Sequence, residues 1–440
     1  MAATLRTPFT ELAPPLSPEE ALVEADRCLE CGGPYAEAPC VVACPADVDV
    51  PGFVGAIARG EAERAAEIVW QENLLGGSCA RVCPVEVLCA GACVLLHEGR
   101  DPIEIGRLQR YATDAGLAAG LPLRPPASRR RTGRVVVLGA GPAGLTCAGE
   151  LAARGIEVTV VDERAEPGGL VRFAIAPYRQ QREPLPAEAA ALERLGVRFR
   201  LGTRVDSPQA LRELLDGADA LFLGVGMGAD ADVAYPGDEL DGVWESLPFI
   251  ETLKTGAPPA VEGRRVAVLG GGNTAVDVAV ESARLGASEV TMIYRRTETE
   301  MPAYPHEVEQ ARAEGVSILF LASPVRFVGE REVRGVECVR MRLAEPDESG
   351  RRRPEPVPGS EFLLAADVVV KAIGRRPRSE LLSWLEGVEL AGGKVVVDGD
   401  FRTGNPKVYA AGDACNGGAT VVEAVRGAKV AARAIAERLP

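Results

Sequence analysis

The chain has 440 residues, of which 47% are hydrophobic, so it is long enough for two or three domains with sizeable cores. Its net charge of −14 argues against a general nucleic-acid binder, which needs a basic face. No apolar run reaches the length of a membrane span, and the first twenty residues lack the basic start and apolar stretch of a signal peptide. We therefore expect a cytoplasmic protein that binds neither membranes nor nucleic acid.

The N-terminal region of the chain is predicted to be mostly helical. Ser17 and Glu20 form a capping-box pattern ahead of an expected first helix. Residues 48–73 carry two short amphipathic helices that are separated at Gly60. We therefore expect a helical domain at the N-terminus, over residues 1–120.

Cysteines are concentrated in this helical domain. Eight of the eleven lie before residue 94: Cys28, Cys31, Cys40, Cys44, Cys79, Cys83, Cys89 and Cys93. Clustered thiols in a chain without a secretory signal more often hold metal than form disulfides. A four-thiolate zinc site is one interpretation, since the Cys28/Cys31 pair suits it. Iron–sulfur clusters are favoured, because Cys-Pro occurs at Cys44 and Cys83, and this spacing resembles ferredoxin runs whose Cys-Pro thiol serves the neighbouring cluster.

The composition changes after the helical domain. Residues 121–133 are rich in Pro and Arg, which is typical of a linker. Short Val/Ile/Leu strands then alternate with Ala-rich helices, and this alternation indicates parallel α/β sheets.

The first α/β unit carries a dinucleotide-binding fingerprint. A buried strand at 135–138 leads into Gly139-x-Gly141-x-x-Gly144, followed by a helix and a second strand that ends at Asp162. The glycines allow the tight turn, the approach of a pyrophosphate and close helix–strand packing, while the free N–H groups of the helix start face the phosphates. The acid at the second strand end is placed to accept hydrogen bonds from ribose hydroxyls.

The pattern repeats at Gly270-x-Gly272-x-x-Ala275, again after a strand and before a helix. Its second strand ends in Arg295 and Arg296, without a carboxylate. Guanidinium groups bind a 2′-phosphate in a bidentate manner, whereas a carboxylate would repel it. This unit is therefore predicted to bind NADPH, with NADH possible; the alternative is a pair of solvated surface arginines.

The C-terminal stretch identifies the other dinucleotide as FAD. Residues 403–413 resemble the T-x-x-P-x-V-Y-A-x-G-D signature of flavoproteins with two dinucleotide domains, in which the Asp, here Asp413, meets the ribityl chain. Residues 220–237 and 368–377 resemble the chain crossings between the two domains. The fold class is thus α/β, with a nicotinamide domain inserted in a split FAD domain. The expected first FAD segment, nicotinamide domain and second FAD segment are residues 134–236, 237–366 and 367–440.

The electron acceptor is expected in the helical domain. Disulfide reductases of this class carry a redox-active cysteine pair beside the flavin, but the later cysteines, Cys147, Cys338 and Cys415, are isolated in the sequence. The paired thiols are those at the N-terminus, and zinc has no redox chemistry. Nicotinamide passes two electrons as hydride, iron–sulfur clusters accept one at a time, and a flavin does both. Iron–sulfur clusters are therefore the stronger prediction.

Several further motifs occur in order along the chain: RCLEC…APC…ACP, GGSCARVCP, LCAGAC, PIEIGRLQRYA, EPGGLVRFAIAPYR and GGGNTAVD. With them, residues 18–438 resemble the NAD(P)H-oxidising electron-input module of one family. The family includes the glutamate synthase small subunit, the NAD(P)-binding subunit of bacterial dihydropyrimidine dehydrogenase and the large subunit of the bifurcating NADH-dependent ferredoxin:NADP oxidoreductase.

The resemblance implies two [4Fe–4S] clusters whose ligands interlace along the chain. One cluster would take Cys28, Cys31, Cys40 and Cys93. The other would take Cys44, Cys83, Cys89 and Gln109, with an amide oxygen in place of a thiolate. Cys79 would then be free. The simpler alternative assigns all eight cysteines, four to each cluster.

The resemblance also implies the dinucleotide contacts and no catalytic acid or base, because hydride transfer to flavin requires neither. The implied FAD contacts are Gly139, Gly141, Pro142, Ala143, Gly144, Leu145, Asp162, Gly169, Leu170, Arg179, Gly412, Asp413 and Thr420. The implied NADPH contacts are Gly270, Gly271, Gly272, Asn273, Thr274, Arg295, Arg296, Ala372, Ile373 and Gly374.

The predicted function is that of an NADPH-oxidising, FAD and iron–sulfur oxidoreductase that passes single electrons to a larger catalytic subunit in a hetero-oligomer. Gln109 favours a dihydropyrimidine dehydrogenase-like complex. The alternatives are a glutamate synthase small subunit or the bifurcating oxidoreductase large subunit. A non-enzyme alternative is a zinc-bearing, flavin-free nucleotide-binding scaffold.

Overall fold

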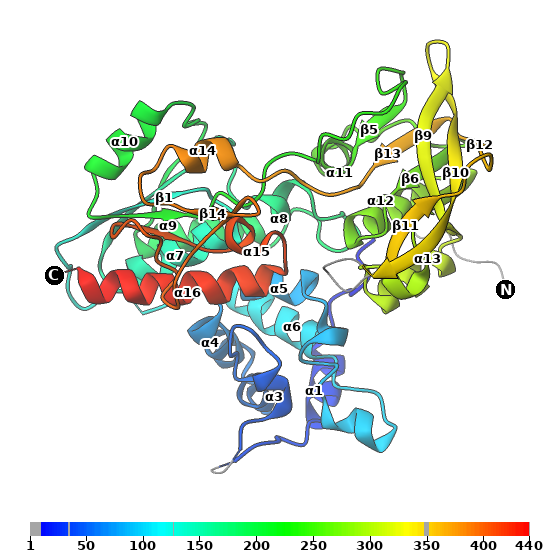
Figure 1. Cartoon of the computed structure of the whole chain (residues 1–440). Coiled ribbons are helices and arrows are strands. Elements are labelled where there is room, and N and C mark those ends of the chain that lie inside the picture. The colour runs from blue at the N-terminus through cyan, green and yellow to red at the C-terminus, as the bar shows by residue number, and fades with distance from the viewer. Residues whose placement is uncertain (1–9, 34–35, 126, 347–351, 440) are drawn as a thin grey trace. The chain divides into compact units, whose positions relative to one another are not determined.

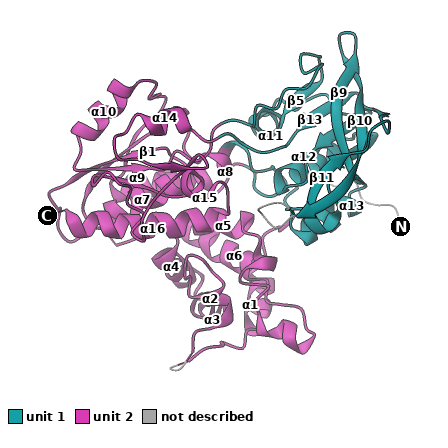
Figure 2. Ribbon diagram, in the orientation of Figure 1, with its two compact units in different colours: residues 1–11, 173–181, 229–376 teal, residues 12–172, 182–228, 377–440 magenta. Residues whose placement is uncertain are grey.

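The computed structural model describes residues 10–33, 36–125, 127–346 and 352–439. The start of the chain, for which the sequence predicts no signal peptide, and residue 126 of the expected linker lie outside these ranges. The described chain forms two compact units (Figures 1 and 2). Unit 1 comprises the described residues of 1–11, 173–181 and 229–376, and unit 2 those of 12–172, 182–228 and 377–440.

The N-terminal portion of unit 2 is helical, as the sequence predicts. The capping box of Ser17 and Glu20 is confirmed, with both backbone N–H groups donating to the partner side chain. Gly60 separates two helices at a φ of 77°. The buried indole of Trp70 lies in the core of this bundle. The helices are α1 (Pro18–Asp26), α2 (Pro39–Val42), α3 (Val50–Ala58), α4 (Ala62–Glu72), α5 (Gly76–Val82) and α6 (Ile105–Ala118), with short 3-10 turns at Val85–Val87 and Val94–Glu98.

The rest of unit 2 is built on a parallel five-stranded sheet of order β16-β4-β1-β2-β3. Its strands are β1 (Arg134–Leu138), β2 (Glu157–Val161), β3 (Arg198–Arg200), β4 (Ala220–Leu223) and β16 (Val408–Ala410). Its helices are α7 (Pro142–Ala153), α8 (Leu170–Phe173), α9 (Leu185–Leu195), α10 (Pro208–Asp216), α14 (Ser379–Ser383), α15 (Asp413–Asn416) and α16 (Val421–Arg438), beside a hairpin of β14 (Leu390–Ala391) and β15 (Lys394–Val395). Alternate strand residues such as Val136 and Leu138 pack against Leu211 of α10 and Leu382 of α14, because side chains alternate between the faces of a sheet.

Unit 1 contains a second parallel sheet, of order β5-β13-β6-β7-β8, and an antiparallel sheet of β9 to β12. The parallel strands are β5 (Val243–Glu245), β6 (Arg265–Leu269), β7 (Glu289–Tyr294), β8 (Ser317–Phe320) and β13 (Val368–Lys371). The helices are α11 (Ser246–Thr255), α12 (Asn273–Arg284) and α13 (Pro305–Ala313), with a 3-10 turn at Glu298–Glu300. The antiparallel strands are β9 (Ala322–Gly329), β10 (Val333–Pro346), β11 (Arg352–Pro356) and β12 (Phe362–Ala365).

The boundaries of the inserted domain differ from those expected from the sequence. Strand β13 pairs with β5 and β6 in register, Val369 lying opposite Val243 and Ala267. The main stretch of unit 1 is residues 229–376, whereas the sequence predicts 237–366 for the inserted domain, and the last stretch of unit 2 begins at residue 377. The apolar run of β13 signalled a buried strand, but only the pairing decides which sheet takes it. In the portion of the chain that the structure describes, no helix is both long and apolar enough to cross a bilayer.

A short stretch of the first FAD segment, residues 173–181, belongs to unit 1, where buried polar groups fix it to α12. The hydroxyl of Tyr178 donates to Asp277 Oδ1 at 2.6 Å, and the Tyr178 backbone N–H donates to Glu281 Oε1 at 3.1 Å. Lys254 Nζ donates to the carbonyl oxygens of Ile175 and Gln180. Burial raises the pKa of the Glu281 carboxyl to about 8, although the Tyr178 N–H favours the charged form.

We predict that Glu281→Gln changes how stability depends on pH. The pKa of Glu281 is about 8 in the folded chain and about 4.3 in an unfolded one. The folded chain retains a proton that the unfolded chain releases, so wild-type stability falls as pH rises between these values. Glutamine cannot ionise, so the variant should gain about 2 kcal/mol relative to wild type between pH 6 and pH 8. Thermal unfolding midpoints at the two pH values measure this difference.

The control for this prediction is Glu330→Gln, which removes an exposed carboxylate from the same unit. Its midpoint should follow that of the wild type at both pH values. Parallel pH profiles for wild type and Glu281→Gln would show that Glu281 is already ionised near pH 6.

Candidate functional site

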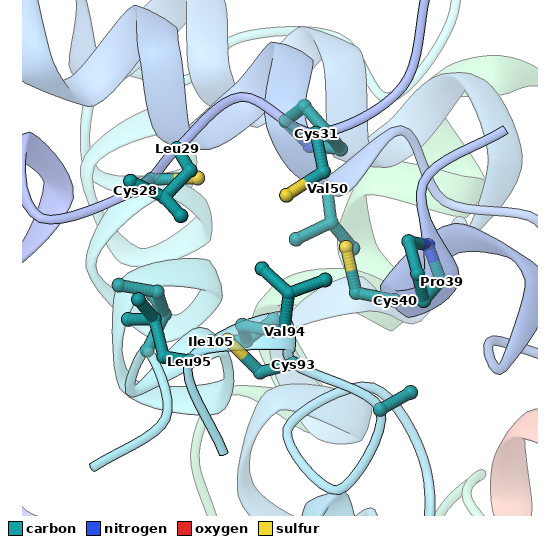
Figure 3. Close-up of a pocket in the computed structure, with 13 residues that line it drawn as sticks. Cys28, Leu29, Cys31, Pro39, Cys40, Val50, Cys93, Val94, Leu95 and Ile105 are labelled. Atoms are coloured by element: carbon teal, nitrogen blue, oxygen red, sulfur yellow. The ribbon is translucent and has the colours of Figure 1, made fainter. Parts of the chain in front are cut away.

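Four cysteines line a first cavity in the helical portion of unit 2. Cys28 and Cys31 follow α1, and Cys40 lies in α2. Cys93 comes from the second cysteine group and precedes the turn Val94–Glu98. Their sulfur atoms point toward a common space (Figure 3). The structure thus brings together the four cysteines that the resemblance assigns to one cluster. The other lining residues are apolar: Leu29, Pro39, Val50, Pro51, Ala92, Val94, Leu95, Ile103 and Ile105.

A second cavity gathers the remaining sulfur ligands expected from the sequence. Its potential ligands are Cys44, Cys79, Cys83, Cys89 and Gln109. It therefore offers five side chains to a cluster that takes four ligands. One wall is supplied by Val422 of α16, from the far end of the sequence. Sequence reasoning missed this contribution, because nothing in the α16 pattern distinguishes Val422 from an ordinary core residue.

The fifth side chain of the second cavity is either Gln109 or Cys79. Gln109 Nε2 donates to the carbonyl oxygen of Gly76 at 2.7 Å. This contact engages the amide nitrogen, so the amide oxygen is the atom that remains to bind a metal. Cys79 is only 2% exposed, and its thiol is hydrogen-bonded to that of Cys83. Both side chains are within the cavity, so the choice between them remains a prediction.

The chemistry of both cavities fits iron–sulfur clusters. Their donors are mainly cysteine thiols in apolar surroundings, and thiolates are the ordinary ligands of such clusters. Burial raises the pKa of the Cys40 thiol to about 11 and that of the Cys89 thiol to about 12, so cluster binding must release protons. Within the described ranges, no three His, Cys, Asp or Glu side chains are grouped to hold a single metal ion.

The turn between β1 and α7 has the geometry of a pyrophosphate-binding loop. Gly139 has a φ of 103°, and a Cβ atom there would lie 2.4 Å from the carbonyl oxygen of Gly224. At Gly144 a Cβ would lie 1.9 Å from the Gly139 oxygen, whereas at Gly141 the nearest atom would be 3.9 Å away. The middle glycine is thus open for a ligand to approach. Asp162 Oδ2 accepts from the N–H of Ala140 at 2.6 Å and fixes this turn to the second strand end.

Other predicted FAD residues lie against the same turn. A Cβ at Gly169 would lie 2.9 Å from the Cα of Gly141, and one at Gly412 would lie 3.1 Å from the Cβ of Ala143. Asp413 begins α15, directly after Gly412. The structure therefore gathers glycine loops from three separate stretches of sequence into one site.

Helix α16 connects this site with the second cavity. Thr420, a predicted FAD contact, caps the helix in a capping box with Glu423. Val422 lines the second cavity two residues later. Further along, Lys429 Nζ donates to Ala46 O at 2.8 Å and to Glu72 Oε2 at 2.5 Å, and Ala46 follows the Cys44-Pro pair.

A buried carboxylate makes a second connection between the helical portion and the dinucleotide-binding portion of unit 2. Glu188 of α9 accepts hydrogen bonds from the N–H groups of Gly77 and Ser78 at 2.9 and 3.0 Å, and from Ser78 Oγ at 2.5 Å. These donors start α5, the helix that carries Cys79. Burial raises the pKa of Glu188 to about 6, while the Ser78 hydrogen bonds oppose the shift. Sequence reasoning missed Glu188 because its partner lies far away in the chain.

The corresponding turn in unit 1 contains the predicted nicotinamide contacts. Gly270 has a φ of 139°, and a Cβ there would lie 2.2 Å from the carbonyl oxygen of Ala372. The two predicted contact stretches, 270–274 and 372–374, are therefore neighbours. Asn273 Oδ1 accepts from the N–H of Tyr304 at 3.1 Å, which positions the start of α12.

The two predicted phosphate-binding arginines have different environments. Arg295 is exposed at the end of β7. Arg296 is 5% exposed, and its Nε donates to the carbonyl oxygen of Arg352 at 2.8 Å. Of these two arginines, only Arg295 thus presents its side chain to solvent.

Arg179, a predicted flavin contact, is in unit 1. Its guanidinium pairs with Asp277 at 2.7 Å and with Glu307 at 3.0 Å. These two carboxylates hold the pKa of Arg179 above its usual value against the effect of burial. Its observed partners are therefore residues of the nicotinamide unit, and a flavin contact remains a prediction.

Two Rossmann-type sheets, each with a glycine-rich turn, and two cysteine-lined cavities define a flavin- and nicotinamide-dependent redox protein. Residues 133–428 match the family model "Pyridine nucleotide-disulphide oxidoreductase". Residues 5–121 match a model of the dihydropyrimidine dehydrogenase domain II, which carries a 4Fe–4S cluster. The chain belongs to the pyridine nucleotide-disulphide oxidoreductase family and is an NADPH-dependent FAD oxidoreductase with a 4Fe–4S domain. The predicted fold class and cofactor types are confirmed, and the number of clusters remains a prediction.

The chain is similar to characterised relatives over most of its length. It is 39% identical over 442 residues to "Glutamate synthase [NADPH] small chain" of Halomonas elongata, covering 96% of this chain and 92% of that one. It is 38% identical over 421 residues to "NADP(+)-dependent formate dehydrogenase subunit beta" of Moorella thermoacetica, covering 89% and 58%. The solved structure of Mycobacterium tuberculosis FprA in complex with NADPH shares the fold, with a TM-score of 0.56 at 19% identity over 70% of this chain and 84% of that one.

We predict that Gln109, not Cys79, completes the second cluster. Gln109→Ala should then lose about four of about eight iron atoms per chain, because a cluster that lacks one of its four ligands is poorly held. Cys79→Ala should keep all of them. Iron analysis and low-temperature EPR of the reduced protein measure both effects.

Gln109→Glu is the matched control for this pair, because it keeps an oxygen ligand at the same place. It should retain the iron that Gln109→Ala loses. Loss of iron from Cys79→Ala, with Gln109→Ala intact, would instead support the assignment of four cysteines to each cluster.

Proposed function

We propose that this protein takes hydride from NADPH and delivers single electrons, through two clusters, to a partner subunit. When bound, FAD accepts hydride and releases single electrons, which iron–sulfur clusters carry. The chain's own residues bind and orient these groups. Neither glycine-rich motif, 139–144 or 270–275, contains a histidine, and hydride transfer to flavin needs no general acid or base.

The observation that carries the proposal is the path of α16. Thr420 belongs to the predicted FAD site and Val422 to the second cavity. Two residues span at most about 7 Å, so the two sites meet at one helix end. The residues that line the first cavity all come from positions 28–105, within the helical domain. We therefore assign the second cavity to the flavin side and the first cavity to the partner side.

The environments of the two arginines support a division of roles. Exposed Arg295 is available to bind the 2′-phosphate that distinguishes NADPH from NADH. Arg296 is committed to the backbone of β11 through its bond to Arg352. We propose that Arg295 selects the nucleotide and that Arg296 maintains the local fold.

We predict that Arg295→Ala raises the KM for NADPH by about tenfold to a hundredfold, because a charged hydrogen bond contributes about 1.5–3 kcal/mol. The KM for NADH should change little. Steady-state ferricyanide reduction with each nucleotide measures both constants.

Arg296→Ala provides the comparison, since it removes a neighbouring guanidinium of the same charge. It should lower the unfolding temperature and leave the ratio of the two KM values unchanged. A shift of this ratio in Arg296→Ala, without one in Arg295→Ala, would reverse the assignment.

For the partner, we propose a glutamate synthase large subunit. The similarity to the Halomonas small chain covers more than nine-tenths of both chains. It supports the glutamate synthase alternative better than the pyrimidine-reducing complex that Gln109 favours. Gln109 is a single side chain, whereas the similarity extends over the cluster, FAD and nicotinamide regions.

The test is an activity assay of the protein purified from its own cells together with the larger subunit that binds it. We expect NADPH oxidation that depends on 2-oxoglutarate and glutamine together. Oxidation that depends on uracil or thymine would restore the pyrimidine assignment. Reduction of any of these substrates by the isolated chain would contradict the role of electron-input subunit.

A further inference from the structure

Exposed apolar side chains are concentrated in the helical domain. Among the described residues, ten large hydrophobic side chains are exposed, and six of them lie between positions 22 and 96. These six are Leu22, Val23, Leu29, Val42, Val87 and Leu96. Single exposed apolar residues are ordinary, but a concentration in under a fifth of the chain indicates a surface that is covered in a complex.

Two of these side chains lie beside the first cavity, and a third lies on the helix that leads to it. Leu29 lines the cavity beside Cys28 and is 54% exposed (Figure 3). Leu96, 43% exposed, directly follows Leu95, which also lines it. The third is Val23 of α1, at 69% exposure.

Hydrogen bonds hold α1 beside the segment that follows Leu96. Arg27 Nη2 donates to the carbonyl oxygen of Asp101 at 2.6 Å, and Glu24 Oε1 accepts from the N–H of Glu104 at 2.9 Å. Val23 lies one turn before Arg27, on the same side of the helix. Val23, Leu29 and Leu96 therefore belong to one region, which we call the docking surface.

The helical domain that carries the docking surface is negatively charged. Residues 12–121 contain seventeen acidic and seven basic side chains, so their net charge of −10 accounts for most of the −14 of the chain. Asp26 and Glu30 are exposed next to Cys28 and Leu29. Interfaces commonly combine an apolar centre with a polar rim, and opposite charge on the partner accelerates association.

The two cavities differ in how they are covered. Each cavity has three half-buried cysteines and one buried cysteine. The lining of the first cavity also includes exposed Leu29 and Pro39, whereas the described lining of the second, which Val422 of α16 closes on one side, has no exposed residue. A protein that exchanges electrons with this chain thus finds its nearest approach at the first cavity.

We propose that the docking surface binds the electron-accepting partner subunit, and that the contacting face of this subunit has an apolar centre and a rim of Lys and Arg. This proposal rests on the electron-delivery function and names the surface and the partner chemistry that serve it. Val23 and Leu96 supply the apolar contact, and the surrounding carboxylates select the basic face.

The experiment compares acceptors of opposite charge with the cofactor-loaded full chain. NADPH-dependent reduction is measured with cytochrome c, which is basic, with the acidic soluble domain of cytochrome b5, and with ferricyanide as a small acceptor. We expect cytochrome c to be reduced with the higher kcat/KM of the two proteins. The ratio of the kcat/KM for cytochrome c to that for cytochrome b5 should fall as ionic strength rises from about 0.01 M to 0.15 M, because the Debye length falls from about 30 to 8 Å.

The double variant Val23→Ser/Leu96→Ser tests the apolar contact. Its kcat/KM for cytochrome c should fall by about tenfold, since partial burial of two such side chains is lost. Its rate with ferricyanide should stay at the wild-type value. The matched control is Val325→Ser/Leu363→Ser, which changes two exposed apolar side chains in unit 1 and should reduce cytochrome c as the wild type does.

Three results would overturn the proposal. The first is a higher kcat/KM for cytochrome b5 than for cytochrome c. The second is an unchanged cytochrome c rate in the Val23→Ser/Leu96→Ser variant. The third is a wild-type dimer in sedimentation that this variant dissociates, which would assign the surface to a second copy of the chain. Failure of the wild type to reduce ferricyanide with NADPH contradicts the electron-input function itself, and so separates the two hypotheses.

Discussion

Electrons pass between buried centres only over short distances, so the helical domain must be held rigidly against the FAD-binding sheet. The structure meets this constraint with two polar anchors. Glu188 of α9 binds the start of α5, and Lys429 of α16 binds the loop after Cys44. The Glu188 carboxylate is fully buried and satisfies the first N–H groups of α5, which have no partner inside their own helix. Removing one side of such a contact leaves buried donors unsatisfied, which is costly. The second cavity depends on these anchors, because α5 and α16 form its walls.

The order of the cysteines along the chain does not match their order in space. Cys93 joins Cys28 at the first cavity, and Cys44 joins Cys83 at the second. Each cavity therefore requires both cysteine groups, and neither half of the helical domain can complete a site alone. This crossing links metal binding to the folding of the whole domain, since the ligand set exists only after α1, α5 and α6 have packed together.

Buried charges in unit 1 hold a chain segment in place. Arg179 is held between Asp277 and Glu307, and Tyr178 bonds to Asp277. These contacts attach a stretch of the first FAD segment to α12. The chain therefore crosses between unit 1 and unit 2 at more places than the two crossings predicted from the sequence. Ionic contacts of Arg179 hold the additional stretch, residues 173–181, in unit 1.

The sequence by itself determined the helical N-terminal portion, the parallel α/β pattern, both glycine-rich turns and the cofactor classes, but not the antiparallel sheet of β9 to β12. These features are local, because a turn or a capping box is specified by neighbouring residues such as Ser17 and Glu20. Tertiary structure decided which sheet takes β13, which side chains surround each cavity, and which of Arg295 and Arg296 is exposed. Val422, Glu188 and Lys429 also became visible only there. Their roles depend on partner residues more than a hundred positions away in the sequence. A local sequence pattern cannot predict such a contact, because the packing of the whole unit determines which residue becomes the partner.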